Sequence, residues 1–237
     1  MHGSFGRGTI FARLAADLAD QARVVAPDQR GHGLSDRADD YGRAGFVDDA
    51  AFLLRELGMA PAVVLGHSLG GITAYQLAAR HPELVSALII EDAGPVMRQP
   101  EIAHPVLDVR GWPATAPTRH ELARRIEAAG VPDAAYFMQS AVDRGDHWGL
   151  LFDWDEMMAV QKGGVGDWWA DWLGSTCPAV VLHGGQSPLL PSDLARTMVA
   201  RRPGTSFVTF PKAGHWIHDD APAGLAAAVA DFLHRLV

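Results

Sequence analysis

The sequence predicts an α/β fold with a mostly parallel sheet flanked by helices, because short apolar runs alternate with amphipathic segments along most of the chain. This alternation calls for right-handed crossovers and parallel strands. The rhythm stops after Pro95 and resumes near residue 173, which indicates one inserted region. The runs that predict strands are 23–26, 62–65, 86–91, 179–183 and 206–210, and the segments that predict helices are 9–20, 44–57, 71–80, 191–201 and 221–236.

The first predicted helix shows the spacing on which these assignments depend. Its apolar residues recur at i, i+3, i+4 and i+7, which places them on one face of a helix: Phe11, Leu14, Ala15 and Leu18. The apolar run 23–26 follows and ends in the turn 28–35, which is rich in glycine and polar residues. We therefore expect a helix that leads into a buried strand.

The inserted region, residues 96–172, predicts a helical cap, with helices near 118–129 and 155–161. The core is then expected to consist of residues 1–95 and 173–237. Aromatic side chains line ligand pockets, so the cap is expected to roof an apolar site, although the same residues would also serve to hold a small cap onto the core. Six of the seven tryptophans lie in it: Trp112, Trp148, Trp154, Trp168, Trp169 and Trp172.

Composition limits the classes of partner. The chain has 237 residues, 48% of them apolar, and a formal charge of −8 with no run of Lys or Arg. Nucleic acids and anionic membranes are therefore disfavoured, and a small neutral substrate is expected. No segment reaches about 18 consecutive apolar residues and no signal-like stretch is present, which predicts a soluble, cytoplasmic protein. Cys177 is the only cysteine, which excludes an intrachain disulfide, and the sequence leaves the oligomeric state open, a dimer included.

The segment Gly66-His67-Ser68-Leu69-Gly70 carries the strongest chemical signal. It follows the predicted strand 62–65 and precedes the predicted helix 71–80. A Gly-x-Ser-x-Gly turn between a strand and a helix is a nucleophile elbow, in which the serine hydroxyl stands exposed above the sheet and the glycines let strand and helix pass closely. The pentapeptide is common by itself, and its flanks are what predict a nucleophilic Ser68.

Together with three further motifs this elbow resembles the α/β-hydrolase superfamily. The other motifs are His2-Gly3, the turn 28–35 and Gly214-His215 after the strand 206–210. The resemblance covers nearly the whole chain except the cap and implies an α/β-hydrolase fold with a cofactor-free catalytic triad. It implies His215 as the base that takes the proton of Ser68. The competing interpretations are a loop histidine without a task, and His218 as the base.

The third member of the triad departs from the common family pattern. Where an aspartate is expected after strand 179–183, the sequence has Ser187, which cannot stabilise an imidazolium. Some members of the superfamily take the acid from the loop after the strand that follows the elbow, and here that loop contains Asp92. We therefore predict Asp92 as the acid and Ser187 as at most a secondary partner. The alternative is that Asp92 only forms a turn ahead of Gly94-Pro95.

The resemblance also implies where the oxyanion and the substrate would bind. The backbone N–H groups of Leu69 and Ser4 are the expected oxyanion donors, with Phe5 as the alternative to Ser4. No phosphate-binding loop and no metal-ligand spacing is visible, so neither a cofactor nor a metal is expected. The candidate substrate-binding residues are Phe5, His67, Met97, Met138, Trp148, Trp154 and Trp216.

A central strand is expected to be missing from the sheet. In the family, the His-Gly pair closes a strand in the middle of the sheet, whereas here His2-Gly3 follows Met1 directly. That strand would lie between the ones ending near Pro27 and Leu65, and its loss would leave buried backbone groups unpaired. The sequence therefore suggests that Met1 is an internal methionine of a longer natural protein, or else that the sheet is rearranged or completed by a partner.

The favoured function is hydrolysis of a small, largely apolar carboxylic ester or lactone through an acyl-enzyme. The same machinery resembles that of carbon–carbon bond hydrolases, hydroxynitrile lyases and cofactor-free haloperoxidases, and the fold does not choose among them. Haloalkane dehalogenases and epoxide hydrolases are disfavoured because they use a carboxylate where this chain has Ser68. A ligand sensor with a slow or idle triad stays open, whereas a scaffold with a decayed site is disfavoured because Ser68 and His215 are both present.

Overall fold

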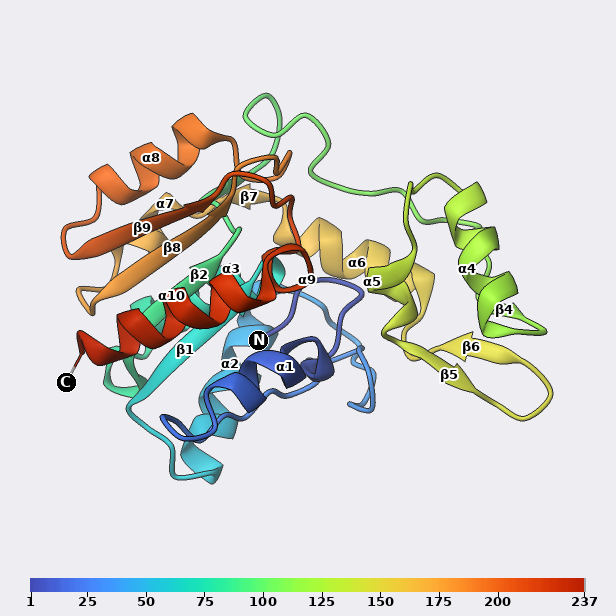
Figure 1. Ribbon diagram of the computed structural model, residues 1–237, viewed down its shortest axis with the longest axis horizontal. Coiled ribbons are helices and arrows are strands. Elements are labelled where there is room, and N and C mark those ends of the chain that lie inside the picture. Colours follow the sequence, from blue (N-terminus) through green and yellow to red (C-terminus); the bar gives the residue numbers. More distant parts are fainter. Residues whose placement is uncertain (237) are drawn as a thin grey trace.

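The computed structural model describes residues 1–236 and is built on a four-stranded parallel sheet in the order β1-β2-β8-β9 (Figure 1). Parallel pairing runs through the whole sheet, with Leu65 opposite Ile89, Ile89 opposite Val180, and Val180 opposite Ser206. The predicted α/β class is therefore confirmed. The strands are β1 (Ala62–His67), β2 (Val85–Glu91), β8 (Ala179–Gly184) and β9 (Thr205–Phe210).

Alternate residues of the central strands feed two separate hydrophobic cores. Ala87 and Ile89 of β2 belong to one core, while Leu88 and Ile90 belong to the other. This follows from the two-residue period of a strand, whose side chains point to opposite faces. Because both faces are covered, β2 is apolar almost throughout, as expected for a buried parallel strand.

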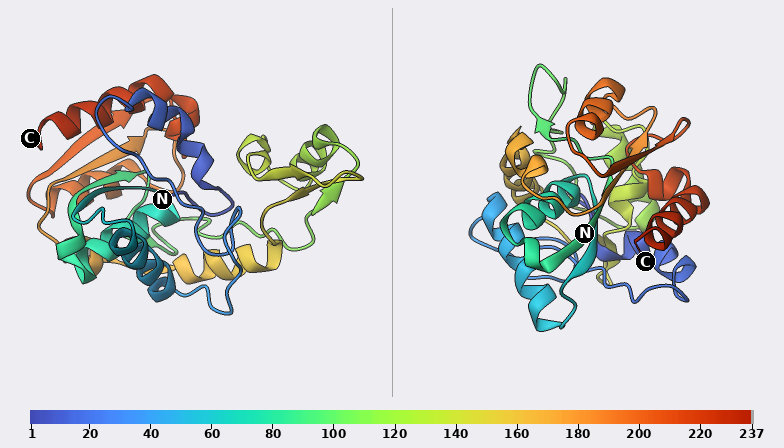
Figure 2. Two further views of the ribbon diagram at one scale, coloured as in Figure 1. Left: turned by 90° about the horizontal axis from the view of Figure 1, so that it is seen from below. Right: turned by 90° about the vertical axis from the view of Figure 1, so that its left-hand side faces the viewer.

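Helices form a layer on each face of the sheet (Figure 2). On one side α1 packs against α10, and Leu14 and Val229 enter the first core. On the other side α3 packs against α2 and α7, and α3 places Ile72 and Leu77 in the second core. The bounds of these helices are α1 (Ala12–Asp17), α2 (Arg43–Glu56), α3 (Leu69–Arg80), α7 (Trp169–Leu173), α8 (Ser192–Ala200), α9 (Ile217–Asp220) and α10 (Pro222–His234), and 3₁₀ turns cover Gly8–Phe11 and Pro82–Leu84.

The predicted strand 23–26 is wrong. Residues 22–27 form no strand in the structure, and the side chains of Val24 and Val25 are each 39% exposed. A strand exists only by pairing, and the sheet ends at β1 without a neighbour that this segment could join. Its apolar sequence is therefore left without the burial that the pattern predicts.

The region between β2 and β8 forms a mixed cap rather than a purely helical one, and it extends to one side of the sheet (Figure 1). Its predicted helices are present as α4 (Arg119–Ala128) and α6 (Trp154–Gly164), which Thr118 and Asp153 cap with their side chains. The short strands were not predicted, because two or three residues carry no readable period. The remaining elements are α5 (Ala135–Met138), β3 (Val96–Met97), β7 (Gly166–Asp167), β4 (Thr115–Ala116), β5 (Ala141–Asp143) and β6 (Trp148–Leu150).

The tryptophans at the end of the cap nearest β8 pack against the second core. Trp172 is fully buried against Tyr75, with its ring nitrogen donating to the Met198 carbonyl at 2.9 Å, so it packs in the core. The centroid of the Trp169 ring lies 4.0 Å from the guanidinium carbon of Arg201, at the same end of the cap.

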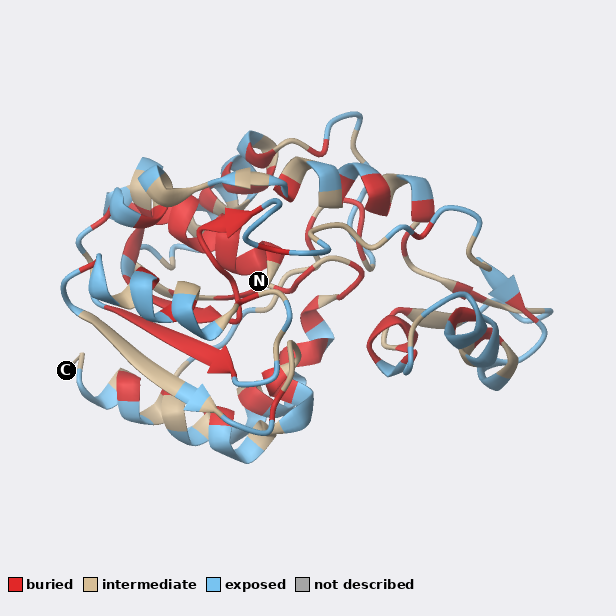
Figure 3. Cartoon of the chain, turned by 90° about the horizontal axis from the view of Figure 1, so that it is seen from above, coloured by how far each residue is buried: buried red, intermediate tan, exposed pale blue. Residues whose placement is uncertain are grey.

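Buried residues are concentrated in the sheet and its inner helix faces (Figure 3). Within residues 1–236, no helix has the length and apolarity needed to cross a membrane.

Candidate active site

Ser68 lies between β1 and α3 in a strained backbone conformation, with φ 53° and ψ −121°. Its N–H donates to the Glu91 carbonyl at 3.0 Å, which fixes the elbow to the end of β2. The flanking glycines leave no room for a side chain: a Cβ on Gly66 would lie 2.1 Å from the Gly70 oxygen, and a Cβ on Gly70 would lie 2.3 Å from the Met1 oxygen. The turn therefore requires both glycines, and it places Ser68 at the N-terminus of α3.

His215 contacts Asp92, the acid predicted from the sequence. His215 Nδ1 lies 2.7 Å from Asp92 Oδ2. Asp92 follows β2 with a positive φ of 46° and is only 1% exposed, while the His215 side chain comes from the loop after β9. A buried carboxylate in this contact orients the ring so that Nε2 is the nitrogen free to exchange a proton.

Ser187 completes the environment of Asp92. Its hydroxyl donates to Asp92 Oδ2 at 2.5 Å, and the N–H of Gly184 donates to Asp92 Oδ1 at 3.0 Å. The residue that stands at the usual acid position thus holds the acid that comes from the end of β2. With His215, these groups give the buried carboxylate three donors, which satisfies a charge removed from water.

His67 connects the elbow with the His215 loop. Its Nε2 lies 2.9 Å from the His215 carbonyl oxygen and therefore carries the proton, because a carbonyl only accepts. Burial lowers the pKa of His67 well below its usual value, and the nearby His215 and His218 act in the same direction. His67 is therefore a neutral structural bridge, and its Nδ1 faces Gly3, whose added Cβ would lie 2.9 Å away.

The His2-Gly3 motif lies directly against Ser68. A Cβ on Gly3 would lie 2.9 Å from the Ser68 Cβ, and the Gly6 N–H donates to the Gly3 carbonyl at 3.2 Å, which closes a turn over Ser4 and Phe5. Phe5 holds a positive φ of 67° there. Leu69 is the first residue of α3, so its N–H has no acceptor within the helix. The expected oxyanion donor Leu69 thus follows Ser68 directly, and the expected donor Ser4 follows the glycine that lies against the Ser68 side chain.

The His2 ring fixes the start of this turn. Its Nε2 accepts from the Gln29 N–H at 2.9 Å, so Nδ1 is the protonated nitrogen and donates to the Gly3 carbonyl at 2.8 Å. Burial lowers the pKa of His2 well below its usual value, which keeps this tautomer uncharged. The turn 28–35 is joined to the same loop, because Asp28 accepts from the Gly8 N–H at 2.7 Å.

Comparison with known proteins decides the family. A sequence profile of the alpha/beta hydrolase family matches residues 1–228. The chain belongs to the α/β-hydrolase family.

Individual relatives of this hydrolase have different activities. It is 28% identical to an sn-1-specific diacylglycerol lipase, ABHD11, of Mus musculus, over 98% of this chain and 79% of the relative. It is 26% identical to the esterase YbfF of Escherichia coli strain K12, over 99% and 91%. The crystal structure of an E-2-(acetamidomethylene)succinate hydrolase is similar in fold, with a TM-score of 0.86 at 24% identity over 98% and 89%. The lipase and the esterase support ester hydrolysis at a coarse level, and the substrate stays open.

The cap of the hydrolase contacts residues 3–6, the loop that carries the expected donor Ser4 and is called the oxyanion loop below, through an aromatic cluster. Phe5 lies 5.1 Å from Phe137 and 6.0 Å from Trp154 between ring centroids, and Phe152 lies 4.9 Å from Trp154. Trp112 packs against the same rings. The cap therefore covers the loop that carries Ser4 with apolar surface.

The other predicted substrate-binding residues are placed differently. Trp216 stacks on Tyr136 at 5.2 Å and lies 5.8 Å from the His215 ring. Met138 is buried in the core that contains Phe5, and Trp148 packs against this core from β6. Met97 lies on β3 opposite Gly166 and is not a member of the aromatic cluster. The structure thus gathers most of these residues near the oxyanion loop, and their contact with a substrate stays a prediction.

Two cap residues near Phe5 were missed by the sequence analysis. The buried hydroxyl of Ser140 donates to the Phe5 carbonyl at 2.9 Å, which ties the cap to the oxyanion loop. The buried hydroxyl of Tyr136 finds no hydrogen-bond partner among residues 1–236, and burial raises the pKa of Tyr136. They lie in and near a four-residue helix, α5, which shows no readable period in the sequence.

Glu91 and His218 form a second buried contact that the sequence analysis did not predict. Glu91 Oε1 lies 2.9 Å from the His218 backbone nitrogen and 2.7 Å from His218 Nδ1. Burial by itself would lower the pKa of His218, but the Glu91 carboxylate outweighs it and the pKa is raised. The pair ties α9 to the end of β2, which leaves His218 occupied as a structural group rather than as the base in place of His215.

The same pair and His67 form a donor set that suits a divalent transition metal. Their ligating atoms all lie within 4.8 Å of one another, and two imidazoles with one carboxylate are a frequent ligand combination for such ions. The sequence spacing predicted no metal site, because these residues come from β1, β2 and α9, which only the fold brings together.

Substituting Gly3 by Ala is expected to lower kcat about 100-fold or more. The added Cβ would lie 2.9 Å from both the Ser68 Cβ and His67 Nδ1, which is closer than van der Waals contact allows. The loop would have to shift, and the shift would displace an oxyanion donor. Steady-state ester hydrolysis with matched thermal unfolding measures this. Gly149→Ala is the control, because its Cβ would meet nothing closer than 3.8 Å. Equal kcat values for the two variants would contradict the placement of the loop.

Proposed function

We propose that this hydrolase is a cofactor-free serine hydrolase that cleaves a small, largely apolar carboxylic ester or lactone through an acyl-enzyme. Ser68 is the nucleophile, His215 the base and Asp92 the acid. The observation that carries the proposal is the 2.7 Å contact between His215 Nδ1 and a buried Asp92, in the same site as a serine held at a strained elbow. This combination of roles is what activates a serine hydroxyl, which is a poor nucleophile at neutral pH.

The first half of the reaction forms the acyl-enzyme. Ser68 Oγ attacks the carbonyl carbon while His215 Nε2 takes the hydroxyl proton, and Asp92 stabilises the resulting imidazolium without itself becoming protonated. The backbone N–H groups of Leu69 and Ser4 donate to the developing oxyanion, an effect of about 2.7–4 kcal/mol per donor. The imidazolium then protonates the leaving alkoxide as the ester C–O bond breaks.

The second half releases the acid and restores the enzyme. His215 takes a proton from a water molecule, whose oxygen attacks the acyl carbon of the ester to Ser68. The same oxyanion donors act again. When the tetrahedral intermediate collapses, the bond to Ser68 Oγ breaks, His215 returns the proton to that oxygen, and the carboxylic acid leaves. A lactone passes through the same steps, with its alcohol remaining on the acyl chain.

An apolar substrate is supported by the surroundings of the nucleophile. The aromatic cluster around Phe5 lies in the loop next to Gly3, and Trp216, stacked on Tyr136, lies 5.8 Å from the His215 ring, so apolar rings surround the reacting groups. An overall charge of −8 disfavours an acidic substrate. The esterase and lipase activities of the relatives agree with an ester as the bond that is cleaved.

The proposal is tested by labelling with an alkyl fluorophosphonate followed by intact-mass measurement. Ser68 Oγ displaces fluoride from phosphorus, so we expect one adduct per chain. Ser68→Ala and His215→Ala should abolish it at equal exposure, whereas Asp92→Asn should slow it. An adduct of unchanged rate in Ser68→Ala would overturn the assignment of the nucleophile.

Turnover then separates an enzyme from a ligand sensor. A panel of short-chain esters and lactones is mixed with a limiting amount of the chain, and product is counted per mole of enzyme. We expect many turnovers, lost in Ser68→Ala. A single turnover, followed by retention of the acyl group or of the intact ligand, would instead favour a sensor that keeps a slow triad.

A further inference from the structure

Three buried side chains with ligating atoms meet beside the proposed triad, and we call them the His67–Glu91–His218 cluster. His67 and Glu91 directly precede the nucleophile and the acid, and His218 follows the base by three residues. Two of the chain segments that form the cluster end β1 and β2, and the third is α9. An ion held by the cluster would therefore be attached to all three segments that carry the triad.

Each imidazole of the cluster has one nitrogen held by an acceptor and one without a partner. His67 Nε2 donates to the His215 carbonyl at 2.9 Å, and His218 Nδ1 lies 2.7 Å from Glu91 Oε1. His67 Nδ1, His218 Nε2 and Glu91 Oε2 are buried and have no hydrogen-bond partner among residues 1–236. Histidines that bind metals almost always show this division, because the held N–H orients the ring and leaves the other nitrogen for the ion.

The charges around the cluster favour a cation. The Glu91 carboxylate is fully buried, and the Asp219 carboxylate lies 3.8 Å from His218 Nε2. The ring of Tyr136 lies 6.1 Å from the rings of both histidines, and its buried hydroxyl also has no partner among the described residues. A buried polar group without a partner costs free energy, so a ligand that engages several of these atoms would be stabilised.

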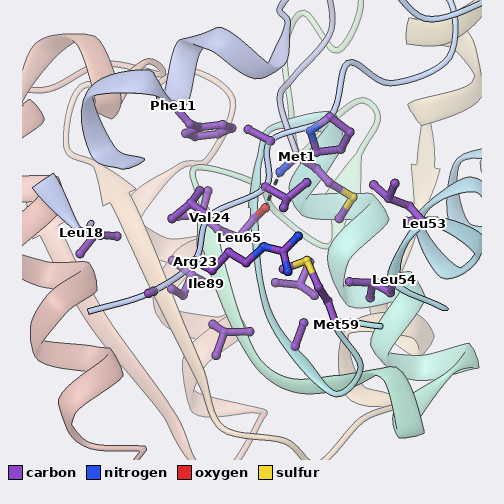
Figure 4. A pocket seen from close by; sticks show the side chains of 18 of the residues that line it. Met1, Phe11, Leu18, Arg23, Val24, Leu53, Leu54, Met59, Leu65 and Ile89 are labelled. Carbon is purple, nitrogen blue, oxygen red and sulfur yellow. Dashed lines mark hydrogen bonds between the residues drawn. The ribbon is translucent and has the colours of Figure 1, made fainter. Parts of the chain in front are cut away.

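Apolar residues lie on one side of the cluster. Phe11 packs against His218 with their ring centroids 5.8 Å apart, and it also lines a groove of about 430 Å³ along the free edge of β1 (Figure 4). The groove is lined almost wholly by apolar side chains, such as Leu65 and Ile89, and supplies no further ligand. In such surroundings the attraction between a cation and a carboxylate is strong, because little water screens it.

We propose that the His67–Glu91–His218 cluster binds one divalent transition-metal ion, such as Zn²⁺, and that the bound ion inhibits the hydrolase. One ligating atom from each residue lies within 4.8 Å of the others. Two imidazoles and one carboxylate suit Zn²⁺ and its neighbours, whereas Mg²⁺ and Ca²⁺ prefer oxygen ligands. Three protein ligands leave the fourth position of a tetrahedral ion to water. The inhibition rests on the proposed function, and the binding does not.

The inhibition follows from charge. The ring centroids of His67 and His215 are 4.6 Å apart, so an ion on His67 adds positive charge close to the base. This holds even where the ion displaces a proton from His218, because the ion carries two charges. His215 becomes an imidazolium when it takes the proton of Ser68, and a nearby positive charge disfavours that step. We therefore expect the bound ion to lower kcat about tenfold or more.

Binding is tested with Co²⁺ and the Ser68→Ala chain, in which no reaction is read. Co²⁺ takes the same ligands as Zn²⁺ and absorbs visible light, so its spectrum reports the coordination number. It is added to the folded chain and, separately, is present during refolding from urea, so that slow entry to a buried site does not hide binding. We expect one bound ion per chain with a four-coordinate spectrum. A spectrum that stays that of hydrated Co²⁺ in both preparations would overturn the proposal.

Ligand variants locate the ion. His67→Gln keeps an N–H that can donate to the His215 carbonyl but has no ring nitrogen for the metal, and Glu91→Leu/His218→Leu leaves no buried charge unpaired. Both should lower the affinity for Co²⁺ about a hundredfold or more. If both variants still bind one ion with unchanged affinity, the ion lies elsewhere, and melting curves of each variant check its fold.

Two controls separate the cluster from other histidines. His147→Ala removes an exposed imidazole that lies 2.6 Å from the Asp146 carboxylate, and it should bind Co²⁺ as before. His215→Ala should also keep the ion, because the cluster does not use that ring. Loss of the ion in His215→Ala would place it on the triad, and loss in His147→Ala would place it on the surface, so either result would contradict the proposal.

Zn²⁺ inhibition of ester hydrolysis is then measured in the chain with its native Ser68. We expect kcat to fall about tenfold or more, to recover when EDTA removes the ion, and to fall equally in His147→Ala. Bound Zn²⁺ with an unchanged kcat would overturn the inhibitory role. A chain that binds Co²⁺ at the cluster but hydrolyses no ester would instead contradict the proposed function, so the two failures are distinguishable.

Discussion

Asp92→Asn is expected to lower kcat about ten-thousand-fold while leaving the fold intact. The asparagine can keep the contacts to Gly184 and Ser187, so little structural change should follow. It cannot stabilise the imidazolium of His215, and its amide N–H favours the wrong tautomer of the ring. The loss therefore belongs to the proton transfer and not to substrate binding, and it should affect kcat far more than KM.

Steady-state hydrolysis of an activated ester, with circular dichroism melting of the same preparations, measures this effect. The matched control is Ser187→Ala, which removes one donor to Asp92 but keeps the carboxylate. A hydrogen bond to a charged group contributes about 1.5–3 kcal/mol, so we expect roughly a tenfold to hundredfold loss there. Near-full turnover of Asp92→Asn, with a larger loss in Ser187→Ala, would move the acid function away from Asp92.

The four strands of the main sheet were predictable from the sequence, whereas the two- and three-residue strands of the cap were not. β1, β2, β8 and β9 are each short apolar runs bounded by turns, and the structure pairs them in one sheet. The run 23–26 has the same character yet forms no strand, because hydrogen bonding to a neighbour is what makes a strand and the groove beside β1 stands in that place. Sequence pattern reports burial preference, and pairing is a property of the whole sheet.

The candidate site could be predicted where residues follow the carboxyl ends of parallel strands. Ser68, Asp92 and His215 follow β1, β2 and β9, and the ends of parallel strands meet at one edge. Tyr136 and the Glu91–His218 pair could not be predicted, since their roles depend on how the cap and α9 fold back. Glu91 in particular ends a strand beside Asp92 and looks in the sequence like one more acidic turn residue.

His218→Leu is expected to lower the free energy of unfolding by about 3–5 kcal/mol. The carboxylate of Glu91 is fully buried, and the substitution removes the side chain that pairs with it. Urea unfolding at pH 6 measures the loss. The double variant Glu91→Leu/His218→Leu should recover part of it, because two apolar residues leave no buried charge unpaired. A double variant less stable than His218→Leu would contradict this explanation.

The pH dependence of stability follows from the same pair. The pKa of His218 is raised in the folded protein above its unfolded value of about 6.5, so the folded state binds more protons between these two values. The stabilisation is therefore complete below about pH 6.5 and is lost as pH rises through the folded pKa. Glu91→Gln should flatten this decline, although Asp219, whose carboxylate lies 3.8 Å from His218 Nε2, retains a smaller part.

Activity should respond to this titration less than stability does, although the pair fixes the chain three residues after His215. His218 is held to Glu91 through both its ring and its backbone nitrogen, and Glu91 also accepts the Ser68 N–H through its carbonyl. Loss of the His218 proton weakens the ring contact but leaves the backbone contact. We therefore expect stability to fall with pH before kcat does, and a simultaneous fall of both would mean that the proton on His218 also positions His215.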